Sequence, residues 1–129
     1  MKIALSSVMV NNQDNAKKFY TEVLGFITKH DIAMGEFRWL TVVSPDDVDG
    51  TELVLEPVND DSARTFQQVM YSYGKPAMAF TVDDVEQEFE RLKSLGVKFT
   101  QEPIEMGEIK RAVLDDTCGN YIQIFQVLS

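Results

Sequence analysis

The sequence predicts an α+β fold in which one βαβββ unit occurs twice within 129 residues. A strand-like run and a helix pattern that stops at Leu24-Gly25 recur about seventy residues later, where the pattern stops at Leu95-Gly96. Each copy continues into further strand-like runs. The last of these, 50–56 and 119–125, both begin with glycine. A repeat of this period indicates two similar structural units in succession.

The first copy begins with a strand at 3–10 and an amphipathic helix. Spacings of three and four residues place five apolar side chains on one helix face: Ala16, Phe19, Tyr20, Val23 and Leu24. Asn12 and Asp14 are both suitable N-caps, and Gly25 suits a left-handed C-terminal end. Three strands are expected next, near 26–33, 37–43 and 51–56.

A second helix is expected at 60–73, with Ala63, Phe66, Val69, Met70 and Tyr73 on one face. It has no counterpart in the second copy, so we expect it to connect the halves. The second copy offers a strand at 77–82 and a helix whose first residues, 84–87, resemble a capping box. Its remaining strands are expected near 97–100, 109–115 and 120–127.

The chain has the length of one typical domain, so a single domain is expected to span 1–129. Within it we expect module one at 1–57, the connecting helix segment at 58–75 and module two at 76–129. Helices confined to one face of each sheet leave the other face free. Two such free faces can enclose a cavity.

Composition limits the partners and the compartment. The formal net charge is −9, so nucleic acid and anionic membrane surfaces are unfavourable partners. The only cysteine, Cys118, cannot form an intrachain disulfide. The first residues lack the apolar core of a signal peptide, and no apolar stretch reaches the roughly 20 residues that span a bilayer. We therefore expect a cytoplasmic protein.

Two motifs carry a resemblance to a known family: Phe19-Tyr20-x-x-x-Leu24-Gly25-Phe26 and Asp116-Thr117-Cys118-Gly119-Asn120. Together with the repeat, they resemble the vicinal oxygen chelate (VOC) superfamily. This superfamily includes glyoxalase I, extradiol dioxygenases, fosfomycin-resistance enzymes and bleomycin-resistance proteins. The resemblance covers nearly the whole chain. It implies the glyoxalase/bleomycin resistance/dioxygenase-like fold, two tandem βαβββ modules in one domain, and a homodimer.

The resemblance also implies four metal-ligand positions, on the first and last strands of each half. They fall on Leu5, Val54, Ala77 and Gln123. Three of these side chains have no donor atom, so we expect no metal at this site and no cofactor. The only histidine, His30, is expected on a second strand, away from all four positions.

Strand alternation, with the family positions facing the cavity, provides the candidate ligand-binding residues Trp39, Glu52, Glu56, Arg111, Tyr121 and Gln123. Glu52 and Glu56 would bind a ligand or supply a general base. Alternatively, both would reach water at a rim or pair with Arg111. Trp39 would stack on a flat or cationic ligand, or fill the core.

Arg111 and Tyr121 also have two interpretations each. Arg111 would clamp an anion or form a structural salt bridge. Gln123 would be a hydrogen-bonded pocket amide, and Tyr121 would pack at the cavity wall or at a subunit contact. Cys118 and His30 are weak candidates for catalysis, since a thiol needs a nearby base or positive field to become a nucleophile.

These observations favour a metal-independent small-molecule-binding protein of the glyoxalase and bleomycin-resistance type. The ligand would lie in the cleft between the sheets and would be neutral or cationic. One alternative is a metal-dependent lyase, isomerase or transferase resembling glyoxalase I. A second alternative is a non-catalytic interaction module, and the sequence leaves open whether the chain is an enzyme.

Overall fold

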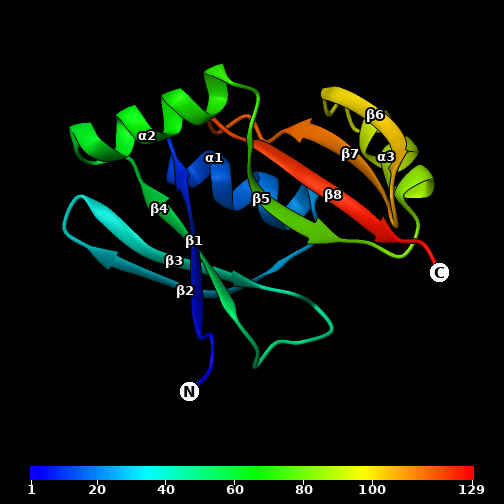
Figure 1. The fold of residues 1–129 in the computed structure, drawn as a ribbon. Helices are drawn as coiled ribbons and strands as arrows, with labels where there is room; N and C mark the ends of the chain where they lie inside the picture. Colours follow the sequence, from blue (N-terminus) through cyan, green and yellow to red (C-terminus); the bar gives the residue numbers. More distant parts are fainter. The chain divides into compact units, whose positions relative to one another are not determined.

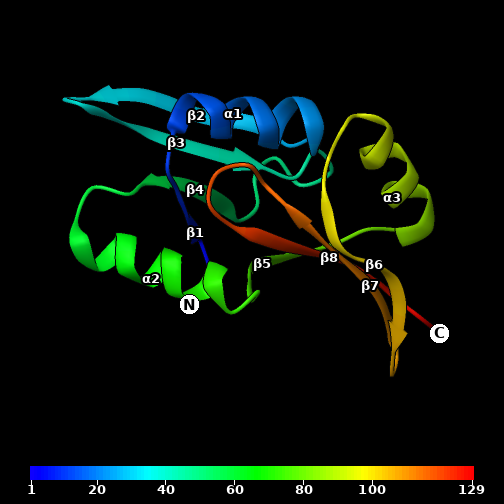
Figure 2. The same ribbon diagram turned by 90° about the horizontal axis from the view of Figure 1, so that it is seen from above.

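The computed structural model describes residues 1–129, which divide into two compact units, 1–66 and 67–129. Each unit contains one four-stranded sheet. A helix packs against one face of each sheet, α1 in the first unit and α3 in the second (Figures 1 and 2).

The first unit contains β1 (Leu5–Val10), α1 (Gln13–Lys18), a π-helical turn η1 (Phe19–Val23), β2 (Ile27–Met34), β3 (Phe37–Val43) and β4 (Glu52–Pro57). Its sheet has the order β1-β4-β3-β2. β1 runs parallel to β4, and the other neighbouring strands are antiparallel. The last strand of the module therefore lies in the interior of the sheet, beside the first.

Helix α2 (Asp61–Ser72) follows, and its residues from Gln67 onward belong to the second unit. The second unit continues with β5 (Pro76–Thr81), α3 (Val85–Ser94), β6 (Phe99–Met106), β7 (Ile109–Asp115) and β8 (Tyr121–Val127). Its sheet has the order β5-β8-β7-β6, which repeats the order of the first sheet. This topology confirms the α+β fold with two tandem βαβββ modules, while the expected domain limits stay a prediction.

Both module helices begin at a side-chain cap. The Asn12 side chain accepts a hydrogen bond from the Asn15 backbone N–H at 2.9 Å, and Asp84 accepts one from Gln87 at 3.1 Å. Such caps satisfy backbone donors that the first helical turn leaves unpaired. Of the two predicted caps for α1, the structure uses Asn12. Asp14 instead pairs with Arg38.

Alternation along the strands builds the core of the first unit. The residues of β1 and β4 that face α1 and η1 are buried: Val8, Val10, Leu53 and Leu55. They share this core with Ala16, Phe19 and Tyr20, which come from the predicted apolar helix face. The opposite face of the same sheet is therefore the one that can carry a binding site.

Two elements differ from the sequence-based expectation. β6 continues to Met106, although a strand ending near residue 100 was expected. Its pairing with β7 is irregular between Gln101 and Ile104, and this irregularity accommodates Pro103, which has no N–H for a regular ladder. The apolar face expected for α2 is largely exposed: Phe66 is 59% exposed and Tyr73 75%, whereas the polar Gln67 is buried.

None of the helices is both long enough and apolar enough to cross a membrane.

Candidate functional site

The face of the first sheet that lies away from α1 carries two carboxylates. In the register of β1 with β4, Ser7 lies opposite Val54 and Met9 lies opposite Glu56. The same register sets Leu5 opposite Glu52. Because alternate strand residues share a face, these side chains lie on one side of the sheet, as alternation predicted.

β2 and β3 extend this face. Thr41 lies opposite Val54 on one side and His30 on the other, and Trp39 lies opposite Ile32. Trp39 therefore shares the face of Thr41, two residues away along β3. The face combines the indole of Trp39 with the carboxylates of β4.

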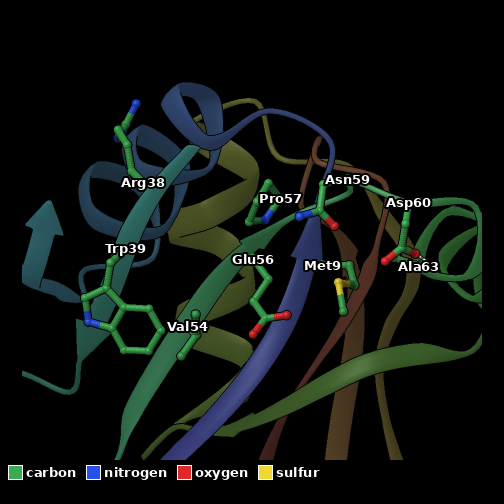
Figure 3. Close-up of a pocket in the computed structure, with 9 residues that line it drawn as sticks. All are labelled: Met9, Arg38, Trp39, Val54, Glu56, Pro57, Asn59, Asp60 and Ala63. Atoms are coloured by element: carbon green, nitrogen blue, oxygen red, sulfur yellow. Dashed lines mark hydrogen bonds between the residues drawn. The ribbon is translucent and has the colours of Figure 1, made fainter. Parts of the chain in front are cut away.

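A pocket of about 300 Å³ lies on this unit. Its lining comes from β1, β3, β4, the segment before α2 and the first turn of α2: Met9, Arg38, Trp39, Val54, Glu56, Pro57, Asn59, Asp60 and Ala63. Figure 3 shows Trp39 projecting from β3 and Glu56 projecting from the adjacent β4. Trp39 and Glu56, two residues singled out in the sequence, thus line the same pocket.

The carboxylate of Glu56 has a neutral partner. Its Oε1 accepts a hydrogen bond from the Ser7 hydroxyl at 3.2 Å. No ion pair involves this side chain, which is half-buried. A carboxylate that is partly removed from water and is not neutralised by a cation creates a negative potential in its pocket.

The only cationic side chain in the pocket lining, Arg38, is engaged elsewhere. The Arg38 guanidinium pairs with Asp14 and, at 2.9 Å, with Asp31. The hydrogen bond to Asp14 and the charge of Asp31 raise the pKa of Arg38 above its ordinary value. In Figure 3 the Arg38 side chain extends away from Glu56. Arg38 therefore does not cancel the charge of Glu56.

Asp60 adds a second carboxylate to the pocket lining. Its Oδ1 accepts hydrogen bonds from the Ala63 backbone N–H and the Ser62 hydroxyl, both at 2.8 Å. These two hydrogen bonds lower the pKa of Asp60 below its ordinary value. The pocket therefore contains an indole and two carboxylates.

Glu52 lies in a different local environment from Glu56. Its Oε1 accepts a hydrogen bond from the buried Thr41 hydroxyl at 2.7 Å and lies 3.5 Å from His30 Nε2. His30 lies on the second strand as expected, two strands from Val54, and the strand register sets it opposite Thr41 and near Glu52. Strand pairing of this kind cannot be read from the position of one histidine in the chain.

The remaining candidates belong to the second unit. Arg111 donates from Nε to Gln101 at 3.0 Å and from a terminal nitrogen to Gln123 at 2.9 Å, so both of its acceptors are neutral amides. Tyr121 stacks on Tyr71 of α2, with ring centroids 4.3 Å apart. Gln123 is thus hydrogen-bonded, as expected, and Tyr121 packs against a helix. A role of these residues in binding stays a prediction.

The residues at the family metal positions do not fit a metal ion. Leu5 and Val54 in the first unit and Ala77 in the second have no donor atoms, and Gln123 accepts from Arg111. No group of three or more His, Cys, Asp or Glu side chains lies close enough together to hold a metal ion. The side chains at these positions therefore support no metal-based chemical step.

The sequence did not indicate one residue, Gln13, that supports the site from beside the pocket. The side chain of Gln13, the first residue of α1, hydrogen-bonds to the backbones of both β3 and β4 next to the pocket. The only signal available in the sequence was a glutamine directly after an N-cap, which is common on exposed helix starts. Nothing in the sequence alone indicated that its amide reaches a sheet.

Comparison with known proteins places this geometry in a family. Residues 2–124 match the Glyoxalase/Bleomycin resistance protein/Dioxygenase superfamily. The uncharacterized protein YurT of Bacillus subtilis (strain 168) is 56% identical over 126 residues, covering 98% of this chain and 99% of YurT.

Solved structures agree with this match. The crystal structure of UcmS2 superposes with a TM-score of 0.83 at 32% identity and 97% coverage of both chains. TnmS3, an antibiotic binding protein from Streptomyces sp. CB03234, superposes with a TM-score of 0.75 at 27% identity, covering 98% of this chain and 96% of TnmS3. The sequence, the repeated sheet topology and these superpositions lead to one conclusion: the chain belongs to the Glyoxalase/Bleomycin resistance protein/Dioxygenase superfamily.

Proposed function

We propose that this protein binds a small organic molecule without using a metal ion, and that the pocket of the first unit holds the cationic or neutral polar end of that molecule. The observation that carries the proposal is that Trp39 and Glu56, on the neighbouring strands β3 and β4, line the same pocket. The antibiotic-binding relative TnmS3 supports binding rather than a specific reaction.

The pocket chemistry favours a cation over an anion. Glu56 is paired only with a neutral hydroxyl, and Asp60 contributes a second negative charge. A cation–π contact with the indole face of Trp39 would strengthen the binding of a partly desolvated cation by about 1–2 kcal/mol. An anionic ligand would meet two carboxylates and no available cation, because Arg38 is held by Asp14 and Asp31.

The surface beside the pocket favours an apolar body on the same ligand. Ile32 lies opposite Trp39, and Met34 lies opposite Phe37 at the end of the β2–β3 hairpin. These residues alternate onto the face of Trp39, and Ile32, Met34 and Phe37 are 53%, 63% and 38% exposed. Exposed apolar side chains that continue a pocket are typical of a binding surface.

The experiment compares three probes of similar shape: phenyltrimethylammonium, its neutral isostere tert-butylbenzene, and benzenesulfonate. Trp39 is the only tryptophan, so its fluorescence reports on this pocket. We expect the ammonium to bind more tightly than the neutral isostere, and the sulfonate not to bind. The variant Glu56→Gln should weaken ammonium binding about tenfold, which is ~1.4 kcal/mol, while Asp46→Asn in an exposed loop should leave binding unchanged.

Preferential binding of the sulfonate, lost in Arg111→Ala and retained in Glu56→Gln, would overturn this proposal. The expected homodimer and cytoplasmic location stay predictions. Sedimentation of the purified protein tests the homodimer.

A further inference from the structure

The side chain of Gln13 lies at the point where β3 and β4 separate. Its Nε2 donates to the carbonyl oxygens of Arg38, at 2.8 Å, and Leu55, at 3.0 Å. Its Oε1 accepts from the Arg38 backbone N–H at 3.0 Å. One amide side chain therefore joins the backbones of two neighbouring strands.

The backbone pairing of β3 with β4 stops before it reaches Arg38. The paired residues of β3 and β4 are Thr41 with Val54 and Val42 with Leu53. The same register, continued along the strands, sets Arg38 opposite Pro57, which has no N–H to donate. Pro57 therefore cannot donate to the Arg38 carbonyl as a regular strand partner would. Gln13 donates to that carbonyl instead and also accepts from the Arg38 backbone N–H.

The pocket lies at this same end of the two strands. Arg38 and Trp39 of β3 and Glu56 and Pro57 of β4 all line it. Trp39 directly follows the residue whose backbone Gln13 holds on both sides, and Glu56 directly follows Leu55. The separation of the indole from the carboxylate therefore depends on the amide between the strands.

A second hollow of about 250 Å³ supports this placement. Its lining includes Gln13 together with Arg38 and Pro57, which also line the ligand pocket. Shortening the Gln13 side chain would enlarge this hollow and remove the support behind Arg38 and Pro57. The strand ends would then move relative to each other, because three backbone groups would lose their partners.

We propose that Gln13 is a positioning residue that sets the spacing of Trp39 and Glu56, and that the affinity of the pocket for a cationic ligand depends on it. The part of this proposal that concerns ligand rests on the proposed function. The part that concerns spacing is independent of any ligand. A residue that acts this way changes the surroundings of Trp39 without touching the bound molecule.

The test uses the full chain and two variants, Gln13→Ala and Gln13→Met. Methionine has a similar length and packs without hydrogen bonds, so it retains the fold if alanine does not. The matched control is Val43→Ala, a core truncation at the other end of β3. Trp39 fluorescence is quenched separately by caesium and by iodide, and the ratio of the two quenching constants reports the nearness of Glu56 to the indole.

In the parent protein caesium should quench Trp39 more strongly than iodide, and Glu56→Gln should remove that preference. Both Gln13 variants should lower the ratio by about half and weaken phenyltrimethylammonium binding about fivefold, the effect of roughly one lost hydrogen bond. Val43→Ala should leave the quenching ratio and the affinity for phenyltrimethylammonium unchanged. A parent-like ratio in both Gln13 variants would refute the positioning role. If the parent protein binds no ammonium, the proposed function fails, and the quenching ratio still decides the role of Gln13.

Discussion

The rings of Tyr71 and Tyr121 stack nearly parallel, with centroids 4.3 Å apart and planes inclined by 9°. Tyr71 also donates its hydroxyl to Asp115 Oδ2 at 2.7 Å. One side chain of α2 is thereby tied to both β7 and β8. Stacked aromatic pairs contribute about 0.5–1.5 kcal/mol beyond the area they bury. This contact anchors α2 even though its apolar residues Phe66 and Tyr73 are exposed.

Tyr71→Phe should retain the stack and remove the hydrogen bond, lowering the free energy of unfolding by about 1–2 kcal/mol. The hydroxyl of Tyr121 and the carboxylate of Asp115 raise the pKa of Tyr71. A raised pKa stabilises the fold below the unfolded value of about 10, and this contribution is lost as pH rises above it. Urea unfolding at pH 8 and pH 11 should therefore show a smaller difference between parent and variant at pH 11. An equal difference at both values would contradict this account.

Asp31 gives the opposite pH dependence. It accepts from Lys17 at 2.8 Å and from Arg38 at 2.9 Å, and the hydrogen bond from Lys17 and the charge of Arg38 lower its pKa. The stabilisation is present above the unfolded value of about 3.9 and is lost as pH falls through the folded value. Asp31→Asn should reduce the free energy of unfolding at pH 7 by about 0.5–1 kcal/mol.

Urea titrations at pH 7 and pH 3 measure this effect, with the exposed loop variant Asp46→Asn as control. The difference between Asp31→Asn and the parent should shrink at pH 3. A difference that persists at pH 3 would show that Asp31 contributes through packing and not through its charge.

Gly119 and Gly107 form a matched pair for a test of backbone strain. Both have positive φ, +98° and +64°, a region that L-residues with a Cβ rarely adopt. A Cβ at Gly107 would meet nothing within 4 Å, whereas one at Gly119 would lie 2.6 Å from Gln67 Nε2. That nitrogen donates to the Cys118 carbonyl at 3.1 Å inside the core.

Gly107→Ala should therefore lower the free energy of unfolding by about 1–2 kcal/mol, because only the backbone strain of the left-handed conformation is added. Gly119→Ala should lower the free energy of unfolding by about 1–3 kcal/mol more than Gly107→Ala does. The additional loss arises because Gln67 must move and the Cys118 carbonyl loses its hydrogen-bond donor. Thermal or chemical unfolding of both variants measures the difference. Equal losses of unfolding free energy in the two variants would mean that Gln67 rearranges without destabilising the fold.

Metal removal should have no effect on this protein, because Leu5, Val54 and Ala77 stand at three of the four family ligand positions. Tag-free protein should contain clearly less than one equivalent of zinc, nickel, manganese or iron, and EDTA should leave thermal unfolding unchanged. Elemental analysis together with thermal unfolding checks both statements. Stoichiometric metal that resists chelation and is lost in Glu56→Ala would overturn the expectation.

The sequence by itself determined the repeated topology and most element limits. Apolar spacing marked the helices, and the strands at 37–43 and 109–115 agree with β3 and β7. Local signals suffice for this because helix and strand periodicity are properties of neighbouring residues. Alternation also placed Trp39 and Glu56 on one face, where they line a single pocket.

Only the tertiary structure decided which side chains meet. The contacts of Gln13 with Leu55 and of Tyr71 with Asp115 each join residues more than forty positions apart. The sequence also did not predict that Phe66 and Tyr73 of α2 are exposed. An amphipathic pattern identifies an apolar helix face but does not show whether another part of the protein covers that face. Strand register supplies the physical reason, because it brings His30, Thr41 and Glu52 together, and no local pattern in the chain encodes it.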